Sequence, residues 1–278
     1  MAPISDRVVV ITGASAGIGR ALALALAPHK PKLVLAARDV QRLEAAAVPC
    51  RALGAETLVV PVDVTQVERC RHLVEQAVGR FGRLDVLVNN AGQAMWSRFD
   101  ELADLTVIED IMRLNYLGAV YCTHYALPHL KKSRGLVVAM SSIAGLIGVP
   151  RLSGYVASKH ALIGFFESLR IELRDTGVGV TIVAPDFVQS EILARARGAE
   201  GQPLGASPLD QTRLPMAENC AKRIVRAIER RERLVLTSHR AAWGRWGRLL
   251  APGIVDRIAA AAVGFRVESL LGIFGRGR

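Results

Sequence analysis

The chain alternates short apolar runs with longer segments in which apolar residues recur every three to four positions. The apolar runs are rich in Val, Ile and Leu, as is typical of strands that are buried on both faces. These predicted strands cover residues 7–12, 32–37, 56–64, 84–92, 135–142, 177–185 and 233–238. The segments with helical periodicity cover residues 18–27, 39–53, 67–82, 105–130, 154–175 and 217–231. This alternation predicts an α/β fold, in which a doubly wound parallel sheet carries helices on both faces.

The length of 278 residues fits a single domain of this kind followed by a short extension. We predict a Rossmann-type domain over residues 1–238 and a C-terminal extension over residues 239–278. Residues 191–215 are rich in Gly, Pro and small polar residues, so we expect a loop or lid there. Doubly wound sheets bind ligands at the carboxyl ends of their strands, where we expect any chemistry to lie.

Composition excludes several classes of protein. Hydrophobic residues make up 51% of the chain, which excludes a largely disordered protein. Four cysteines lie far apart, without a CxxC motif or a histidine cluster: Cys50, Cys70, Cys122 and Cys220. We therefore expect no structural zinc or other metal site and no disulfide framework, which fits a reducing compartment. The first residues lack the basic and apolar regions of a signal peptide, so we expect a cytoplasmic protein.

The first predicted strand runs into the glycine-rich stretch TGASAGIG at residues 12–19. Its members Gly13, Ser15, Gly17, Ile18 and Gly19 would form a tight turn that opens a helix. Such a turn lets backbone approach a pyrophosphate and offers the free N–H groups of a helix N-terminus. A plain turn is the alternative interpretation, and a Walker loop is excluded because no Gly-Lys-Ser/Thr sequence follows.

Ser142, Tyr155 and Lys159 form a second constellation. Tyr155 and Lys159 lie four residues apart, so they share one face of a predicted helix. Ser142 ends the preceding strand, 13 residues before Tyr155. A phenol beside an ammonium is either a surface pair or an acid–base device, because a nearby positive charge lowers the pKa of a phenol.

These motifs together resemble the short-chain dehydrogenase/reductase family, in its compact single-domain branch. The resemblance covers about residues 5–237 and includes TGASAGIGRA, VDV at 62–64, NNAG at 89–92 and the Ser142, Tyr155 and Lys159 set, in the expected order. It implies an NAD(P)-dependent oxidoreductase that interconverts a ketone or aldehyde and an alcohol. Tyr155 would exchange the proton, Lys159 would lower the pKa of its phenol and reach the nicotinamide ribose, and Ser142 would hold the substrate oxygen.

Asn115 matches the helix asparagine of the family, which supports a water link to the lysine. A buried amide that satisfies helix backbone is the alternative. By the same resemblance, Asp63 and Val64 border the adenine, and Asn90, Ala91 and Gly92 back the adenosine ribose. Val188 and Ser190 would lie on the nicotinamide side, with Tyr155 and Lys159 also contacting the coenzyme. The alternative to an adenine contact for Asp63 is a role at the start of the next helix.

The choice of coenzyme depends on the end of the second strand. NAD-preferring family members carry Asp at the place of Ala37, and here Arg38 follows. A guanidinium suits the 2′-phosphate of NADP, so NADP(H) is favoured while NAD(H) stays open. We interpret Asp39 as the N-cap of the next helix. The alternative for Arg38 is a solvated surface charge.

One position departs from the family pattern. Asp186 follows Pro185, where the family usually has Gly. The substitution removes backbone freedom and puts a carboxylate near the nicotinamide side.

The net charge of +11 is concentrated near the C-terminus. Residues 213–278 hold 14 basic and 5 acidic residues, whereas residues 1–212 hold 22 and 20. Trp243, Trp246 and Leu250 form one apolar stripe there, and residues 254–265 contain a second. We expect this segment either to lie on an anionic membrane surface or to cover the substrate pocket or a neighbouring subunit.

Either interpretation of the C-terminal segment favours a lipophilic substrate, such as a steroid, retinoid or fatty-chain carbonyl or alcohol. No nucleic-acid partner is expected, because no nucleic-acid-binding module accompanies the charge. The resemblance also implies a homodimer or homotetramer. Two rival functions stay open: a catalytically silent NADP(H)-binding sensor or membrane scaffold, and a family epimerase or dehydratase that retains its coenzyme.

Overall fold

The computed structural model describes residues 4–265 except the side chain of Arg240. Its core is one seven-stranded sheet in the order β3-β2-β1-β4-β5-β6-β7. The strands are β1 (Val8–Thr12), β2 (Lys32–Ala37), β3 (Glu56–Pro61), β4 (Val86–Asn89), β5 (Leu136–Met140), β6 (Gly179–Ala184) and β7 (Leu234–Leu236). All neighbouring strands pair in parallel, and the order reverses beside β1. The predicted doubly wound α/β fold is therefore confirmed.

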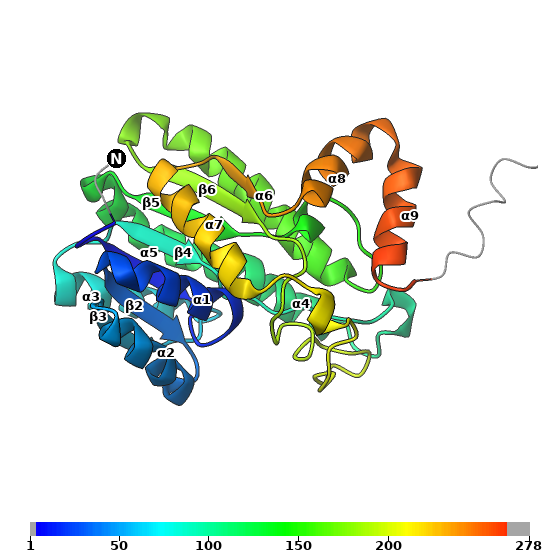
Figure 1. Ribbon diagram of the computed structural model, residues 1–278, viewed down its shortest axis with the longest axis horizontal. Coiled ribbons are helices and arrows are strands. Elements are labelled where there is room, and N and C mark those ends of the chain that lie inside the picture. The colour runs from blue at the N-terminus through cyan, green and yellow to red at the C-terminus, as the bar shows by residue number, and fades with distance from the viewer. Residues whose placement is uncertain (1–3, 266–278) are drawn as a thin grey trace, which may run out of the picture.

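The helices form two layers on the sheet (Figure 1). One layer consists of α1 (Gly17–Leu26), α2 (Val40–Ala52) and α7 (Ala217–Arg230), and the other of α3 (Val67–Phe81), α5 (Gly118–Ser133) and α6 (Ser153–Glu172). Successive strand residues supply the two cores in turn: Ile11 packs in the first and Val10 in the second, and both are fully buried. This explains why the strands appear as continuous apolar runs in the sequence.

The helix predicted over residues 105–130 is interrupted. It consists of α4 (Thr106–Met112), a π-helical turn (Arg113–Leu117) and α5. At the start of α5, a Cβ on Gly118 would lie only 2.8 Å from Val64 Cγ2. Single π-helical turns often occur at functional sites, and this one carries Asn115. Short 3₁₀ turns occupy Ala27–His29, Phe99–Glu101, Ile143–Gly145, Arg174–Thr176 and Gln211–Arg213.

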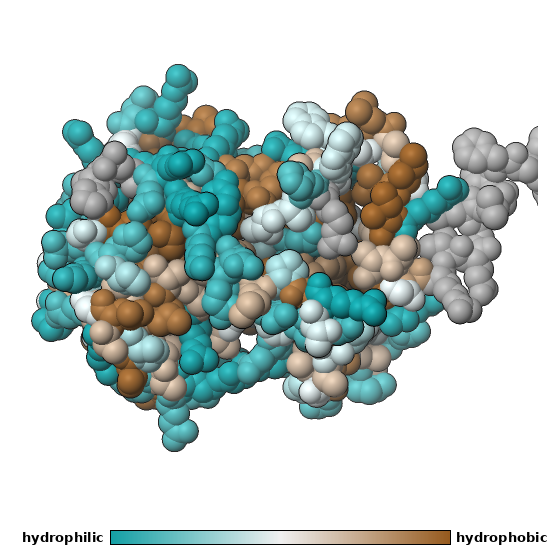
Figure 2. Space-filling view, in the orientation of Figure 1, coloured by the Kyte–Doolittle hydropathy of each residue, from teal (hydrophilic) through white to brown (hydrophobic). Residues whose placement is uncertain are grey.

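Two further helices, α8 (His239–Leu250) and α9 (Pro252–Ala262), project from one end of the sheet (Figure 1). Figure 2 shows hydrophobic residues gathered over these helices. Within residues 4–265, no helix combines the length and hydropathy needed to cross a membrane. Residues 266–278 of the predicted extension lie outside the described residues.

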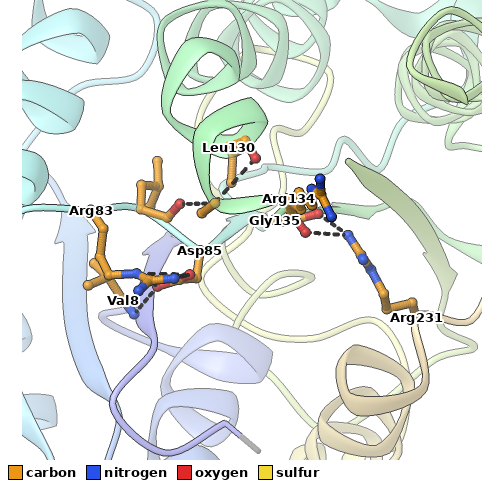
Figure 3. Close-up of polar contacts among 9 residues, drawn as sticks. Val8, Arg83, Asp85, Leu130, Arg134, Gly135 and Arg231 are labelled. Carbon is orange, nitrogen blue, oxygen red and sulfur yellow. Dashed lines mark hydrogen bonds and ion pairs between the residues drawn. The ribbon is translucent and has the colours of Figure 1, made fainter. Parts of the chain in front are cut away.

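The amino ends of the strands are joined by a polar network (Figure 3). The buried Asp85 carboxylate accepts hydrogen bonds from Val8 N at 3.0 Å and from Arg83 Nε at 2.9 Å. Arg231 donates to the carbonyl oxygens of Arg134 and Gly135 in the same region. This network ties β1 to β4 and the end of α7 to the β5 entry, so this end of the sheet is structural.

Candidate active site

The glycine turn connects β1 to α1 at the carboxyl edge of the sheet. Gly13 has φ +66° and Gly17 has φ +51°, in the region that favours glycine. A Cβ on Gly13 would lie 2.9 Å from Ala91 Cα, and one on Gly19 would lie 2.4 Å from the Gly13 carbonyl oxygen. Ala16 precedes α1 without a side-chain cap, so the first N–H groups of α1 are available to an anion.

Thr12 holds this turn against the loop after β4. Its Oγ1 accepts hydrogen bonds from Asn90 N and Ala91 N, both at 3.0 Å. Asn90 Nδ2 in turn donates to Thr12 O at 2.9 Å and to Gly13 O at 3.1 Å. Thr12 opens the TGASAGIG stretch but was not assigned a role in the site, because its contacts with the loop after β4 appear only in the folded chain.

The carboxyl edge of the sheet opens into a cavity of about 700 Å³. Most predicted coenzyme and catalytic residues line it: Gly13, Ser15, Gly17, Ile18, Arg38, Asp63, Val64, Asn90, Ala91, Gly92, Ser142, Tyr155, Val188 and Ser190. Gly19, Asn115 and Lys159 lie behind this lining, and Asn115 and Lys159 are buried. The structure thus brings residues from six strand ends, those of β1 to β6, around one space.

Arg38 is exposed at the end of β2 and lines the cavity. The neighbouring Asp39 is the N-cap of α2, and its carboxylate accepts a hydrogen bond from Arg42 N at 3.0 Å. Arg42 also faces the cavity, but its guanidinium binds both carboxylate oxygens of Glu191, at 3.0 and 2.8 Å. Among the described residues, Arg38 forms no such ion pair. Arg38 is therefore the guanidinium at this end that can bind a phosphate.

Asp63 lies in the turn before α3 and lines the cavity, while its contact with the adenine stays a prediction. Its Oδ1 accepts hydrogen bonds from Thr65 N at 3.0 Å and from Thr65 Oγ1 at 2.8 Å. This contact stabilises the turn that leads into α3, whose N-cap is Gln66. Asp63 also lines the cavity. Its helix-start role is thus indirect, through a turn.

Ser142, Tyr155 and Lys159 converge where β5 ends and α6 begins. Tyr155 and Lys159 lie on the first turns of α6, and Lys159 Nζ lies 5.5 Å from the centroid of the Tyr155 ring. Ser142 follows β5, and its Oγ accepts a hydrogen bond from Ala144 N at 3.1 Å. Tyr155 is half-buried and lines the cavity together with Ser142.

Burial controls the titration of this pair. Desolvation raises the pKa of Tyr155 to about 12, and the neighbouring Ser142 hydroxyl lowers it only in part. Desolvation likewise lowers the pKa of Lys159 to about 8. Lys159 Nζ donates a hydrogen bond to Met140 O at 2.8 Å. The net lowering of the phenol pKa expected from the sequence is therefore wrong for this arrangement, because desolvation raises the pKa and Tyr155 keeps its proton at neutral pH.

The Asn115 amide is fully engaged behind the cavity. Its Oδ1 accepts from Gln93 N at 2.8 Å, and its Nδ2 donates to Gln93 O at 3.0 Å and to Ser158 Oγ at 2.9 Å. A Cβ on Gly92 would lie 3.1 Å from Asn115 Oδ1 and 3.5 Å from Lys159 Nζ. Asn115 thus fixes the loop after β4 close to Lys159. Gln93 and Ser158 were not predicted, because these contacts appear only in the folded chain.

Asp186 faces the cavity and is also bound to the start of α8. Its backbone N–H donates to Thr237 Oγ1 at 2.9 Å, and Ser238 Oγ donates to its Oδ2 at 2.7 Å. Ser238 is the N-cap of α8 and accepts from Ala241 N at 3.1 Å. The carboxylate that replaces the family glycine therefore links the loop after β6 to the C-terminal helices.

The sequence profile described as short chain dehydrogenase matches residues 7–201. The chain belongs to the short-chain dehydrogenase/reductase family. It is 40% identical over 262 residues to 11-beta-hydroxysteroid dehydrogenase A of Sesamum indicum, which covers 91% of this chain and 74% of that protein. It is 42% identical over 229 residues to 11-beta-hydroxysteroid dehydrogenase-like 4A of Arabidopsis thaliana, covering 81% and 74%.

Solved structures of the family agree with this fold. A short-chain dehydrogenase/reductase from Burkholderia phymatum in complex with NAD has a TM-score of 0.80 and 28% identity, covering 92% of this chain and 97% of its own. An alcohol dehydrogenase from Thermococcus sibiricus complexed with 5-hydroxy-NADP has a TM-score of 0.72 and 27% identity, covering 84% and 95%. This short-chain dehydrogenase/reductase is thus an oxidoreductase that acts on CH–OH groups with an NAD(P) coenzyme.

The residues of the glycine turn fit such a coenzyme. Gly13 and Gly19 leave space that a Cβ would fill, and the α1 N-terminus lies at the same place. An anionic pyrophosphate is the group that such a cradle binds.

Part of the cavity lining is apolar. Ala94, Ile143, Leu152 and Leu193 line it and belong to a buried cluster that also contains Trp96. Ala241 of α8 and Val255 and Ala259 of α9 pack in this cluster. The described parts of α8 and α9 do not themselves line the cavity, so these helices support its apolar wall from behind.

Proposed function

We propose that this enzyme is an NADP(H)-dependent dehydrogenase/reductase that interconverts a lipophilic ketone and alcohol of steroid-like character. The observation that carries the proposal is the position of Tyr155, Ser142 and Lys159 between a glycine cradle and an apolar wall. The two plant relatives, named as 11-beta-hydroxysteroid dehydrogenases, support a steroid-like substrate.

The preference for NADP(H) rests on Arg38. Its guanidinium is exposed at the cavity and can form paired hydrogen bonds with a 2′-phosphate. The competing carboxylate of Asp39 caps α2 and is therefore less suited to bind the ribose of NAD.

In the reductive direction, bound NADPH supplies the hydride. The Ser142 hydroxyl donates a hydrogen bond to the substrate oxygen and holds it beside Tyr155. Tyr155 donates its phenolic proton to this oxygen as negative charge develops there. Lys159, held by Met140 O, stabilises the resulting phenolate with its ammonium. A phenol that keeps its proton at neutral pH suits the donor role.

Initial rates with a panel of carbonyl compounds test this proposal. NADPH and NADH are each supplied with steroidal ketones and with small polar ketones. We expect net NADPH oxidation with the steroidal ketones and slower rates with NADH. If the enzyme bound the coenzyme but converted none of the carbonyl compounds, a silent sensor would be favoured instead. If product formed without net coenzyme oxidation, an epimerase or dehydratase would be favoured.

Assembly and location are further parts of the proposal. We propose a homodimer or homotetramer that forms through the long helices α5 and α6, which sedimentation velocity tests directly. A cytoplasmic location, with peripheral attachment to membranes, is tested by fractionation of cells that express the chain. The domain boundary at residue 238 and the lid over residues 191–215 also stay predictions, and limited proteolysis tests both.

A further inference from the structure

The side chains of α8 are arranged in the reverse of the usual order for a helix on a protein surface. Such helices normally turn bulky apolar residues inward and small or polar residues outward. Here Ala241 and Gly244 are buried, whereas Trp243 is 78% exposed and Leu250 is 86% exposed.

The packing of α8 requires small residues on its inner side. A Cβ on Gly244 would lie 3.3 Å from Ile147 Cγ2, and one on Gly247 would lie 3.0 Å from Val255 Cγ2. A bulky residue at either position would push the helix away from its neighbours. The outward direction of the tryptophans and leucines therefore follows from how the helix fits.

The exposed apolar residues of α9 continue this surface. Ile254 and Ile258 are 59% and 58% exposed, while Val255 and Ala259 are buried. We call the combined surface the α8–α9 face; it consists of Trp243, Trp246, Leu249, Leu250, Ile254 and Ile258. Figure 2 shows the hydrophobic residues of this region at the projecting end of the molecule. Exposed apolar residues that gather in one region of a surface mark interaction sites.

The charge around the α8–α9 face is positive. Residues 239–262 contain four arginines and a single acidic residue, Asp256. Arg245 and Arg257 are exposed, and the Arg245 guanidinium lies 5.5 Å from the centroid of the Trp246 ring. Exposed tryptophans next to arginines suit the headgroup region of a bilayer, where rings contact acyl chains and guanidinium groups contact anionic lipid.

We propose that the α8–α9 face docks on the surface of an anionic bilayer, with both helices lying along the interface. The helices are fixed to the enzyme at two places: Ser238 binds Asp186, and Arg248 Nη1 lies 3.2 Å from His160 Nε2. Docking thus holds one end of the molecule against the lipid. This is the end whose helices α8 and α9 support the apolar wall of the cavity. The inference rests on the peripheral attachment proposed above, names the surface and the lipid class that provide it, and does not depend on turnover.

Vesicle binding by the full chain tests the proposal. Vesicles of phosphatidylcholine with and without phosphatidylserine are sedimented with the protein, and tryptophan emission is recorded in parallel. Two of the three tryptophans lie on the face, whereas Trp96 is 8% exposed and provides a constant background. We expect strong binding to the anionic vesicles, weak binding to the neutral ones, a blue shift of emission, and weaker binding at high salt.

The double variant Leu250→Ser/Ile258→Ser keeps all three tryptophans. Its anionic-vesicle affinity should fall by more than about tenfold. Val48→Ser is the matched control, because Val48 is 60% exposed on the distant α2 and should leave binding unchanged. Circular dichroism and thermal unfolding verify that the variants are folded.

Three results would overturn the proposal. The wild-type chain could fail to bind anionic vesicles, or the double variant could bind them as tightly as the wild type. The double variant could also change the molecular mass in light scattering while vesicle binding is absent, which would make the face a contact between two copies of the chain. Steroid reduction in buffer is measured separately, so failure of the enzymatic proposal is distinguishable.

Discussion

Replacing Gly19 by alanine should damage the coenzyme site more than the fold. The added Cβ would lie 2.4 Å from Gly13 O and 2.5 Å from Asn90 Nδ2, two atoms that shape the glycine turn. Overpacking of this kind costs about 1 to 3 kcal/mol. The preference for alanine over glycine in helices offsets at most about 1 kcal/mol of it.

The same displacement moves the N–H groups of α1 away from the pyrophosphate. Loss of one hydrogen bond to a charged group costs about 1.5 to 3 kcal/mol. That cost corresponds to a roughly 10- to 150-fold weaker affinity for NADPH.

Fluorescence titration with NADPH measures this change, and thermal unfolding monitors the fold. Gly79→Ala is the matched control, because Gly79 lies within α3 and its added Cβ would meet no atom within 4 Å. We expect that control to raise stability by about 1 kcal/mol and to leave the affinity unchanged. If Gly19→Ala bound NADPH as tightly as the wild type, the assigned role of the turn would be refuted.

Three further predictions concern coenzyme choice, pH and the C-terminal helices. Arg38→Gln should weaken NADPH binding about tenfold or more without affecting NADH binding, whereas Arg42→Gln should change the affinity for either coenzyme little. Titration of each variant with NADPH and with NADH measures these affinities. The kcat/KM for reduction should decline as pH rises through about 8, because Lys159 loses its ammonium there; a flat profile contradicts this. Asp186→Ala leaves the hydroxyl of Ser238 without its acceptor and should accelerate proteolysis of α8; an unchanged cleavage rate contradicts this.

The sheet and most helices were predictable because parallel strands are buried on both faces. Continuous apolar runs such as residues 32–37 are typical of such strands, and the observed β2 has the same bounds. The break of the long helix at Arg113–Leu117 was not predictable in this way. A π-helical turn keeps the helical periodicity of apolar residues, and the close approach of Gly118 to Val64 depends on tertiary packing.

The parts of the candidate site that were predictable are those whose residues occur in motifs with a characteristic spacing. Ser142, Tyr155 and the glycine turn lie around one cavity as expected. Thr12 and Gln93 were missed because their partners, Asn90 and Asn115, lie 78 and 22 residues away.

Two physical properties of the protein could not be obtained from spacing. The sequence indicated that the Lys159 charge would lower the Tyr155 pKa, but it could not report that both groups are desolvated. Periodicity likewise identified the apolar stripe with Trp243 but not the side of α8 that faces the protein.

The most direct test of the central claim is the rate of NADPH oxidation by Tyr155→Phe with a ketone that the wild type reduces. The phenol contributes the proton, so we predict a fall in kcat of about 100-fold or more with an unchanged affinity for NADPH. Tyr125→Phe, which removes a partly buried hydroxyl on α5, should retain the wild-type rate. A Tyr155→Phe enzyme as fast as the wild type would contradict the account.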